Sequence, residues 1–272
     1  MSGKVYLVGA GPGDPELLTL KALRLLRSAE VVLHDDLITP EILKLVSPTA
    51  HVQNVGKRCG TKTIRQEEIN FLMVTLASSG SQVVRLKSGD PLIFGRAGEE
   101  IEALRQANIE YEIVPGVTSA LGAAASAGIP LTHRRASSTL VLTTGSHASD
   151  SPDKEWAQYA AAKATLVVYM PGQNYVEISA KLAAAGFAEE TPCAVISRAT
   201  TSQQRTLHTT VAELPSVSKL PSPTLLVVGD VVRLADRSSI REIASFSASQ
   251  DTFAPTMFAP AGNAGRDEES LA

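Results

Sequence analysis

Apolar residues in the first half of the chain alternate between two patterns, short continuous runs and longer runs at helical spacing. The helix expected over 15–28 shows the second pattern, with five apolar residues on one face. Such alternation is typical of a mostly parallel sheet covered by helices. The expected strands are 5–8, 30–34, 82–86 and 111–114, and the expected helices are 15–28, 40–46, 64–79, 98–108 and 117–127.

The pattern in the second half of the chain predicts a mixed sheet. Only a short polar stretch separates the strands expected at 193–197 and 204–210, so we expect them to be antiparallel neighbours. We therefore expect an α/β fold, which the length allows to form one or two domains, and a disordered tail over 241–272. The other expected elements are strands at 139–143, 165–170 and 224–228, a polar loop at 146–154 and a helix over 175–185.

Composition narrows the classes of function. The 272 residues carry a net charge of -3 and are 4% aromatic, which disfavours nucleic acid and anionic membranes as partners. The two cysteines, Cys59 and Cys193, form neither a disulfide framework nor a metal-ligand pattern, so we expect no metal site. The chain starts directly in an expected strand and has no long apolar span, so we expect a cytoplasmic protein.

Two short turns with the same residues, Gly13-Asp14-Pro15 and Gly89-Asp90-Pro91, follow two of the expected strands. Glycine lets the backbone turn tightly and approach a ligand, and proline suits the first position of a helix. Their repetition indicates one binding crevice built from two loops. For Asp14 we favour a simpler role as a helix cap.

The glycine-rich run 9–14 suggests a dinucleotide fingerprint, with Asp35 at a suitable distance to hold a ribose. However, Asp14 occupies the place of the third glycine, and Pro12 removes an N–H that could bind pyrophosphate. The run alone is weak evidence for a nicotinamide oxidoreductase, which remains an alternative.

Four further motifs occur in order: VGKR at 55–58, RLKSGDPLIFGRAGE at 85–99, PGVTSA at 115–120 and GIPLTHR at 128–134. With them, residues 4–235 resemble the tetrapyrrole methylase family, and within it the members that methylate uroporphyrinogen III. The resemblance implies two α/β domains, 1–116 and 117–240, with an active-site cleft between them. It implies S-adenosylmethionine as methyl donor, with S-adenosylhomocysteine as its product, and a homodimer. It also implies methylation of uroporphyrinogen III at C2 and C7, which gives precorrin-2 via precorrin-1 for siroheme or cobalamin synthesis.

Site residues follow from the resemblance, position by position. Asp35 and Lys57 match the family's proton acceptor and donor, and Arg96 is added as a third catalytic residue. Arg96, Glu99 and Arg134 match positions that handle the substrate. The cofactor-binding positions are Gly11, Pro12, Ser88, Gly89, Asp90, Ile93, Thr118, Ser119, Met170, Ala199 and Thr224.

Four positions depart from the family pattern. Ser88 replaces a usual glycine, and Thr224 stands where alanine is common. His34 replaces a frequent tyrosine, and Asp36 stands where a basic residue is common. An extra acid beside Asp35 can perturb its proton affinity. Without the resemblance, we would interpret Met170 as a core residue and His133 as a residue that orients its loop.

Chemistry supports the assignment. Uroporphyrinogen carries eight carboxylates, so it needs local cations that the net charge does not supply. The candidates on expected loops are Lys57, Arg58, Lys62, Arg96, Arg134 and Arg135. Solvated surface is an equally good interpretation of Arg58, Lys62 and Arg135.

Two alternatives share this fold. One is a methyltransferase for a later precorrin or a related substrate, and the other is a non-catalytic sensor of cofactor or tetrapyrrole. The family also has a fused form with a dehydrogenase–chelatase region ahead of the methylase. Because the first motif begins at residue 4, we expect the methylase to act alone here.

Overall fold

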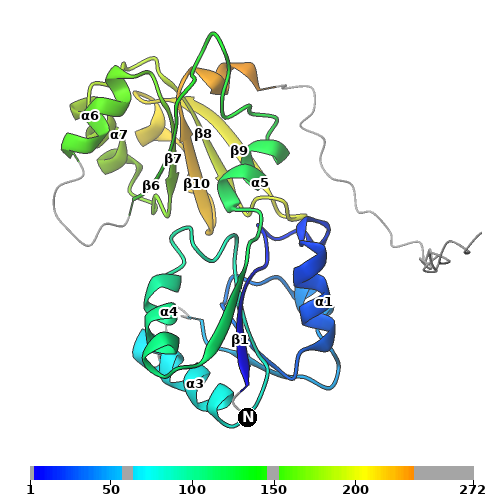
Figure 1. Ribbon diagram of the computed structural model, residues 1–272. Coiled ribbons are helices and arrows are strands. Elements are labelled where there is room, and N and C mark those ends of the chain that lie inside the picture. The colour runs from blue at the N-terminus through cyan, green and yellow to red at the C-terminus, as the bar shows by residue number, and fades with distance from the viewer. Residues whose placement is uncertain (1–2, 57–63, 146–152, 236–272) are drawn as a thin grey trace, which may run out of the picture. The chain divides into compact units, whose positions relative to one another are not determined.

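A computed structural model describes residues 3–56, 64–145 and 153–235. Within these ranges, the strands form two sheets of five strands each, shown in Figure 1. The first sheet has the order β3-β2-β4-β1-β5, and all of its neighbouring strands are parallel. Its strands are β1 (Lys4–Gly9), β2 (Val31–His34), β3 (His51–Asn54), β4 (Val83–Lys87) and β5 (Glu110–Val114). The parallel sheet expected from the first half of the chain is confirmed.

Helices cover both faces of the first sheet. Alternate residues of β1 and β2 point to opposite faces, which separates two apolar clusters. One cluster joins the sheet to α3 (Gln66–Ser78) and α4 (Ala97–Gln106). The other joins it to α1 (Leu20–Ser28) and α2 (Pro40–Leu43). Figure 1 shows α1 on one side of β1, with α3 and α4 on the other.

The second sheet is mixed, in the order β6-β7-β10-β8-β9. β6 and β7 are parallel, whereas β10 runs antiparallel to β7 and β8, and β8 runs antiparallel to β9. The expected antiparallel pair at 193–197 and 204–210 is confirmed. The strands are β6 (Leu140–Thr144), β7 (Thr165–Tyr169), β8 (Pro192–Ser197), β9 (Arg205–Thr210) and β10 (Thr224–Val228).

Each face of the second sheet has its own apolar cluster. α5 (Ser119–Ser126) and the short helix η3 (Asp230–Leu234) pack on one face. α6 (Asp153–Ala161), α7 (Tyr175–Ala184) and η2 (Leu214–Ser216) pack on the other face. Val167 and Tyr169 of β7 face the cluster with α5, and Leu166 and Val168 face the opposite cluster.

Two local predictions from the sequence are wrong, and one strand was not predicted. The continuous helix over 15–28 is split into the short helix η1 (Pro15–Leu17) and α1, because Leu18 is extended and the Thr19 side chain caps the Ala22 N–H. Strand β3 was not predicted, because it lies at the sheet edge, is partly exposed and has no apolar run. Helix α6 begins at Asp153, inside the stretch predicted to be a loop.

The expected boundary between domains near residue 116 falls between the two sheets and stays a prediction. The expected tail over 241–272 lies outside the described residues. Within the described ranges, no helix combines the length and the apolar character needed to cross a bilayer.

Candidate functional site

The two glycine turns contact each other directly. Gly11 N–H donates to the carbonyl of Gly89 at 3.1 Å, and Gly89 N–H donates to the carbonyl of Gly11 at 2.8 Å. Both residues have positive φ, +73° and +69°, which glycine adopts without strain. The predicted meeting of the two turns is therefore confirmed. The crevice between them stays a prediction.

A third glycine closes this backbone arrangement. A Cβ on Gly116 would lie only 2.2 Å from the Gly89 carbonyl oxygen, and one on Gly9 would lie 2.5 Å from the Gly116 nitrogen. The Asp90 carboxylate accepts the N–H of Gly116 at 3.1 Å and the N–H of Leu92 at 2.8 Å. Asp90 therefore ties the second turn to the segment that follows β5.

Asp14 has the same neighbours in sequence but a different role. Its carboxylate accepts the Glu16 N–H at 2.8 Å and caps η1, as predicted. Its backbone N–H donates to Thr200 Oγ1 at 3.1 Å. The first turn is therefore held to the loop after β8, while its carboxylate only caps a short helix.

The start of α5 packs against both turns. Thr118 is the residue just before the helix, and Ser119 is its first residue. A Cβ on Gly89 would lie 3.3 Å from Ser119 Oγ, and one on Gly122 would lie 2.5 Å from the Pro12 ring. The structure thus brings together six predicted cofactor residues: Gly11, Pro12, Gly89, Asp90, Thr118 and Ser119.

The remaining predicted cofactor residues belong to loops around this group or to the second sheet. Ser88 links β4 to Gly89, and half-buried Ile93 packs on the cluster that contains α5. Ala199 follows β8, and its carbonyl oxygen lies 3.4 Å from the Cβ position of Gly13. Thr224 opens β10 and pairs with Ser197.

Met170 follows β7 directly and is 53% exposed, so the interpretation of Met170 as a core residue is wrong. Its φ of 48° lies in the left-handed region, which costs energy for a residue other than glycine. Among the described residues, six others that are not glycine share a positive φ: Phe94, Arg96, Asn108, Lys163, Arg198 and Thr200. Strained backbone of this kind persists where surrounding contacts fix it, and it is often found at functional sites.

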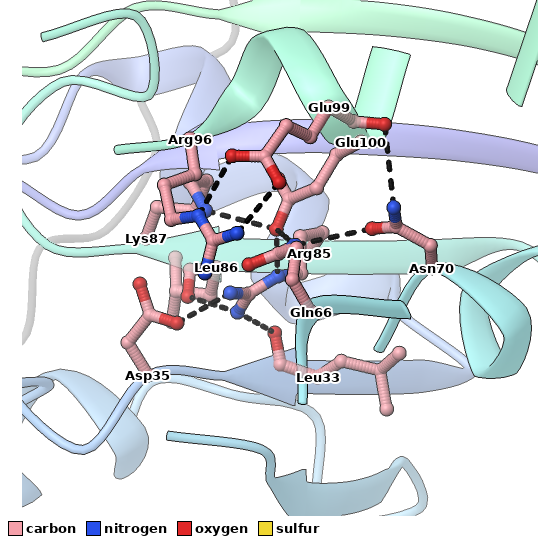
Figure 2. A network of polar contacts seen from close by, with 10 residues as sticks. All are labelled: Leu33, Asp35, Gln66, Asn70, Arg85, Leu86, Lys87, Arg96, Glu99 and Glu100. Carbon is pink, nitrogen blue, oxygen red and sulfur yellow. Dashed lines mark hydrogen bonds and ion pairs between the residues drawn. The ribbon is translucent and has the colours of Figure 1, made fainter. Parts of the chain in front are cut away.

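A buried network of charges lies behind Asp35 and is drawn in Figure 2. Asp35 follows β2, and its side chain is 29% exposed. The Arg85 guanidinium, only 2% exposed, pairs with Asp35 Oδ1 and with Glu100 Oε1, the latter at 2.9 Å. Arg85 also donates to the carbonyl of Leu33 at 3.3 Å. The side chain of Asp35 is thus held by a rigid cation from β4.

Lys87 and Glu100 complete the network. Lys87 Nζ lies 3.0 Å from Glu100 Oε1, which also accepts from Gln66 Nε2 at 3.3 Å. Burial, followed by the charge of Arg85, lowers the pKa of Lys87. Burial alone would lower the pKa of Arg85 too, but the charges of Asp35 and Glu100 outweigh it and leave that pKa raised.

Sequence reasoning missed Arg85, Lys87 and Glu100 as functional candidates. The run 83–87 contains two cations among apolar residues. Because a fully buried strand rarely carries a charge without a partner, these cations could have indicated a buried ion pair. The partner, Glu100, lies on α4, and only the packing of α4 on the sheet reveals the pair.

Arg96 and Glu99, the predicted substrate residues, form a two-pronged ion pair. Arg96 Nε donates to Glu99 Oε1 at 2.7 Å, and Nη2 donates to Oε2 at 2.6 Å. Hydrogen bonding to the partner raises the pKa of Arg96 and lowers that of Glu99. Both side chains are nearly half exposed, so Arg96 can exchange Glu99 for another carboxylate.

Among the described residues, the predicted cations also include Arg134 and Arg135. Arg134 is exposed in a turn that His133 organises: His133 N–H donates to the Ser137 carbonyl at 2.7 Å, and its Nδ1 accepts the Arg135 N–H at 3.3 Å. The expected loop-orienting role of His133 is confirmed. Lys57, Arg58 and Lys62 lie outside the described residues.

Two of the departures from the family pattern flank Asp35. His34 Nδ1 lies 2.9 Å from the Asp35 carbonyl oxygen, and because a carbonyl only accepts, Nδ1 carries the proton. The Asp36 carboxylate accepts from Asn54 Nδ2 at 3.0 Å. Asp36 thus contacts the edge strand β3, and Asp35 contacts Arg85.

Comparison with known proteins places this geometry in a family. Residues 4–215 match the family of Tetrapyrrole (Corrin/Porphyrin) Methylases. The chain is 49% identical to siroheme synthase 2 of Aeromonas hydrophila over 236 residues, and 50% identical to siroheme synthase 1 of Yersinia enterocolitica over 233 residues. These alignments cover 86% and 85% of this chain but 50% and 49% of the relatives, so the chain spans about half of their length.

Solved structures align over nearly their whole length. Uroporphyrin-III-C-methyltransferase from Thermus thermophilus is 45% identical, with a TM-score of 0.73 over 86% of this chain and 95% of that one. A structure of the Thermus thermophilus enzyme complexed with S-adenosyl homocysteine is 40% identical, with a TM-score of 0.75. The alignment covers 85% of this chain and 100% of that one. A cobalt precorrin-4 methyltransferase is 31% identical, with a TM-score of 0.75. The alignment covers 84% of this chain and 95% of that one. With its two-sheet fold and paired glycine turns, this chain belongs to the tetrapyrrole methylase family.

Proposed function

We propose that the protein transfers methyl groups from S-adenosylmethionine to C2 and C7 of uroporphyrinogen III, giving precorrin-2 via precorrin-1. The main support is the alignment with the whole chain of the Thermus thermophilus enzyme complexed with S-adenosyl homocysteine. The residues of this chain fit such a donor. The missing Cβ atoms of Gly9 and Gly116 let three loop backbones pack together, and exposed Met170 directly follows β7.

The methyl donor is a sulfonium cation, and it supplies an electrophilic carbon when bound. Its acceptor is an electron-rich, neutral pyrrole carbon, so the protein needs no strong base to start the reaction. The main demand is in-line positioning, which the tightly packed turns at Gly11 and Gly89 suit. We assign this positioning to the two turns and to the start of α5.

Methylation leaves a cationic ring that must then lose a proton. Asp35 is partly exposed and its orientation is held by buried Arg85, so it suits the role of proton acceptor. We assign the grip on the substrate's carboxylates to Arg96 and Arg134. We propose that Lys57 is the proton donor, as the family resemblance implies.

One experiment tests the proposal. The pure protein is incubated with enzymatically made uroporphyrinogen III and labelled S-adenosylmethionine, and the product is identified by mass and absorption. We expect two methyl groups per ring. Thermal shift with S-adenosylhomocysteine and with NAD runs alongside, and stabilisation by NAD alone would favour the nicotinamide alternative.

The likeness to cobalt precorrin-4 methyltransferase favours one second candidate, a methyltransferase for a later precorrin. Its identity of 31% is lower than the 45% and 40% of the Thermus thermophilus structures, which is why uroporphyrinogen III comes first. Labelling of a later precorrin, with none of uroporphyrinogen III, would select this candidate. Binding of donor product without any turnover would select the sensor.

We also propose a homodimer and a cytoplasmic location. Membership of the tetrapyrrole methylase family supports the homodimer. Light scattering on the purified chain measures the dimer directly.

A further inference from the structure

The phenol of Tyr169 joins three segments that surround the proposed donor site. Tyr169 ends β7 and is 8% exposed. Its hydroxyl oxygen lies 2.5 Å from Thr118 Oγ1 and accepts the Ala120 N–H at 3.0 Å. Its ring packs on Phe94, from the loop after Gly89-Asp90-Pro91, with 4.9 Å between ring centroids.

The hydrogen-bond geometry assigns a direction to the Tyr169 proton. The phenol oxygen already accepts the Ala120 N–H. The phenol therefore donates its single proton to Thr118 Oγ1, which lies within hydrogen-bond distance. Burial raises the pKa of Tyr169 above 10.0, so the phenol keeps that proton at neutral pH. In this arrangement Thr118 turns its own hydroxyl proton away from Tyr169.

The backbone holds Tyr169 in place from two sides. β7 pairs with β6 and β10 along its length, and Tyr169 pairs with Thr144 and Leu225. Its side chain lies in the cluster that also contains Ala120 and Ala123 of α5. A strand with two neighbours is rigid, so the phenol holds the start of α5 in a fixed position.

We propose that Tyr169 is a positioning residue for the methyl donor, acting by fixing the hydroxyl of Thr118 at the start of α5. This inference rests on the proposed function of the same site and names a residue outside the set derived from the sequence. Thr118 is the residue that meets the donor, and Tyr169 acts through it.

The test begins with Tyr169→Phe, which removes one oxygen and keeps the ring on Phe94. Loss of one buried hydrogen bond should raise the Kd for S-adenosylhomocysteine by about five- to tenfold in calorimetry. The KM for S-adenosylmethionine should rise in parallel, while the KM for uroporphyrinogen III stays unchanged. An unchanged Kd overturns the inference.

Tyr175→Phe is the matched control. Tyr175 is 4% exposed and lies in the cluster on the opposite face of the same sheet. Removing its hydroxyl should leave the Kd for S-adenosylhomocysteine at the wild-type value. An equal loss in both variants would mean that general destabilisation, and not the contact with Thr118, sets the affinity.

A double-mutant cycle tests the route through Thr118. Thr118→Ala should weaken binding, Thr118→Ser should keep it, and Tyr169→Phe should add nothing on the Thr118→Ala background. Independent, additive losses overturn the route through Thr118. If the wild-type protein does not bind S-adenosylhomocysteine, the proposed function itself fails, whereas equal binding by wild type and Tyr169→Phe removes only this inference.

Discussion

Gly11 and Gly89 exchange a pair of backbone hydrogen bonds that joins the loop after β1 to the loop after β4. β1 and β4 are neighbours at the centre of the parallel sheet, so their following loops emerge side by side. The pairing needs positive φ at both residues, and the approach of Gly116 needs a missing Cβ. The site is therefore built first from backbone, and its side chains come second.

Gly116→Ala should disrupt this packing. The added Cβ would lie 2.2 Å from the Gly89 carbonyl oxygen, and backbone must move to admit it. We expect a loss of about 1–3 kcal/mol in the free energy of unfolding, measured by urea denaturation, together with weaker binding of S-adenosylhomocysteine. Gly98→Ala on α4 is the control, because a Cβ there meets nothing within 4 Å. A tolerated Gly116→Ala would contradict the close packing.

Asp90→Ala and Asp14→Ala should differ although the two turns share a sequence. Asp90 holds the Gly116 N–H, so its loss should weaken binding of S-adenosylhomocysteine. Asp14 only caps η1, and its loss should cost at most about 1 kcal/mol of stability and leave binding unchanged. Calorimetry on both variants checks the difference, and equal dissociation constants would count against it.

Arg96→Ala should abolish turnover and leave the affinity for S-adenosylhomocysteine nearly intact, because Arg96 is assigned to the substrate's carboxylates. The labelled-donor assay and calorimetry measure the two quantities. Arg65→Ala is a close control, since Arg65 also precedes a helix and pairs with the glutamate three residues later, Glu68. Turnover should survive in that variant. Lost cofactor affinity in Arg96→Ala would refute its assignment to the substrate.

Glu100→Gln should be strongly destabilising. It leaves Arg85 and Lys87 buried with only the Asp35 charge to oppose them, a situation that costs about 3–5 kcal/mol. Glu99→Gln, the adjacent residue of α4, removes a half-exposed pair and should cost less than about 1 kcal/mol. Urea denaturation of both variants tests this contrast. Similar midpoints would mean that the buried network contributes little to stability.

Cys193 should make stability fall at alkaline pH. Burial raises the pKa of its thiol from 9.0 to about 12, so above pH 9.0 the unfolded chain ionises this thiol while the folded chain keeps it neutral. The free energy of unfolding should then fall by up to about 1.4 kcal/mol per pH unit through this group.

The difference between wild type and Cys193→Ala isolates that effect. The lowered pKa of Lys87 acts in the opposite direction, since stability rises as pH climbs toward 10.5, but it is common to both proteins. Denaturation midpoints at pH 8, 9 and 10 should therefore converge. A constant difference across this range would show that the thiol does not titrate as expected.

Much of the fold could be predicted because buried strands are apolar runs and helices show their own period. The edge strand β3 was not predicted because half of it faces solvent. The break between η1 and α1 was not predicted because the apolar face of the two helices is continuous across the Thr19 cap. The glycine turns pointed to the site, since their conformational demands are local. The partners of Arg85 could not be predicted, because Asp35 and Glu100 reach it only through the strand order and the packing of α4.

The network behind Asp35 contains two cations, Arg85 and Lys87, and two carboxylates, Asp35 and Glu100, so its formal charges cancel. If Asp35 takes the proton released after a methyl transfer, one positive charge is left uncompensated in apolar surroundings. Under the proposed function, the proton must therefore leave Asp35 before the second methylation of the ring, and the exposed side of this carboxylate offers a path to water.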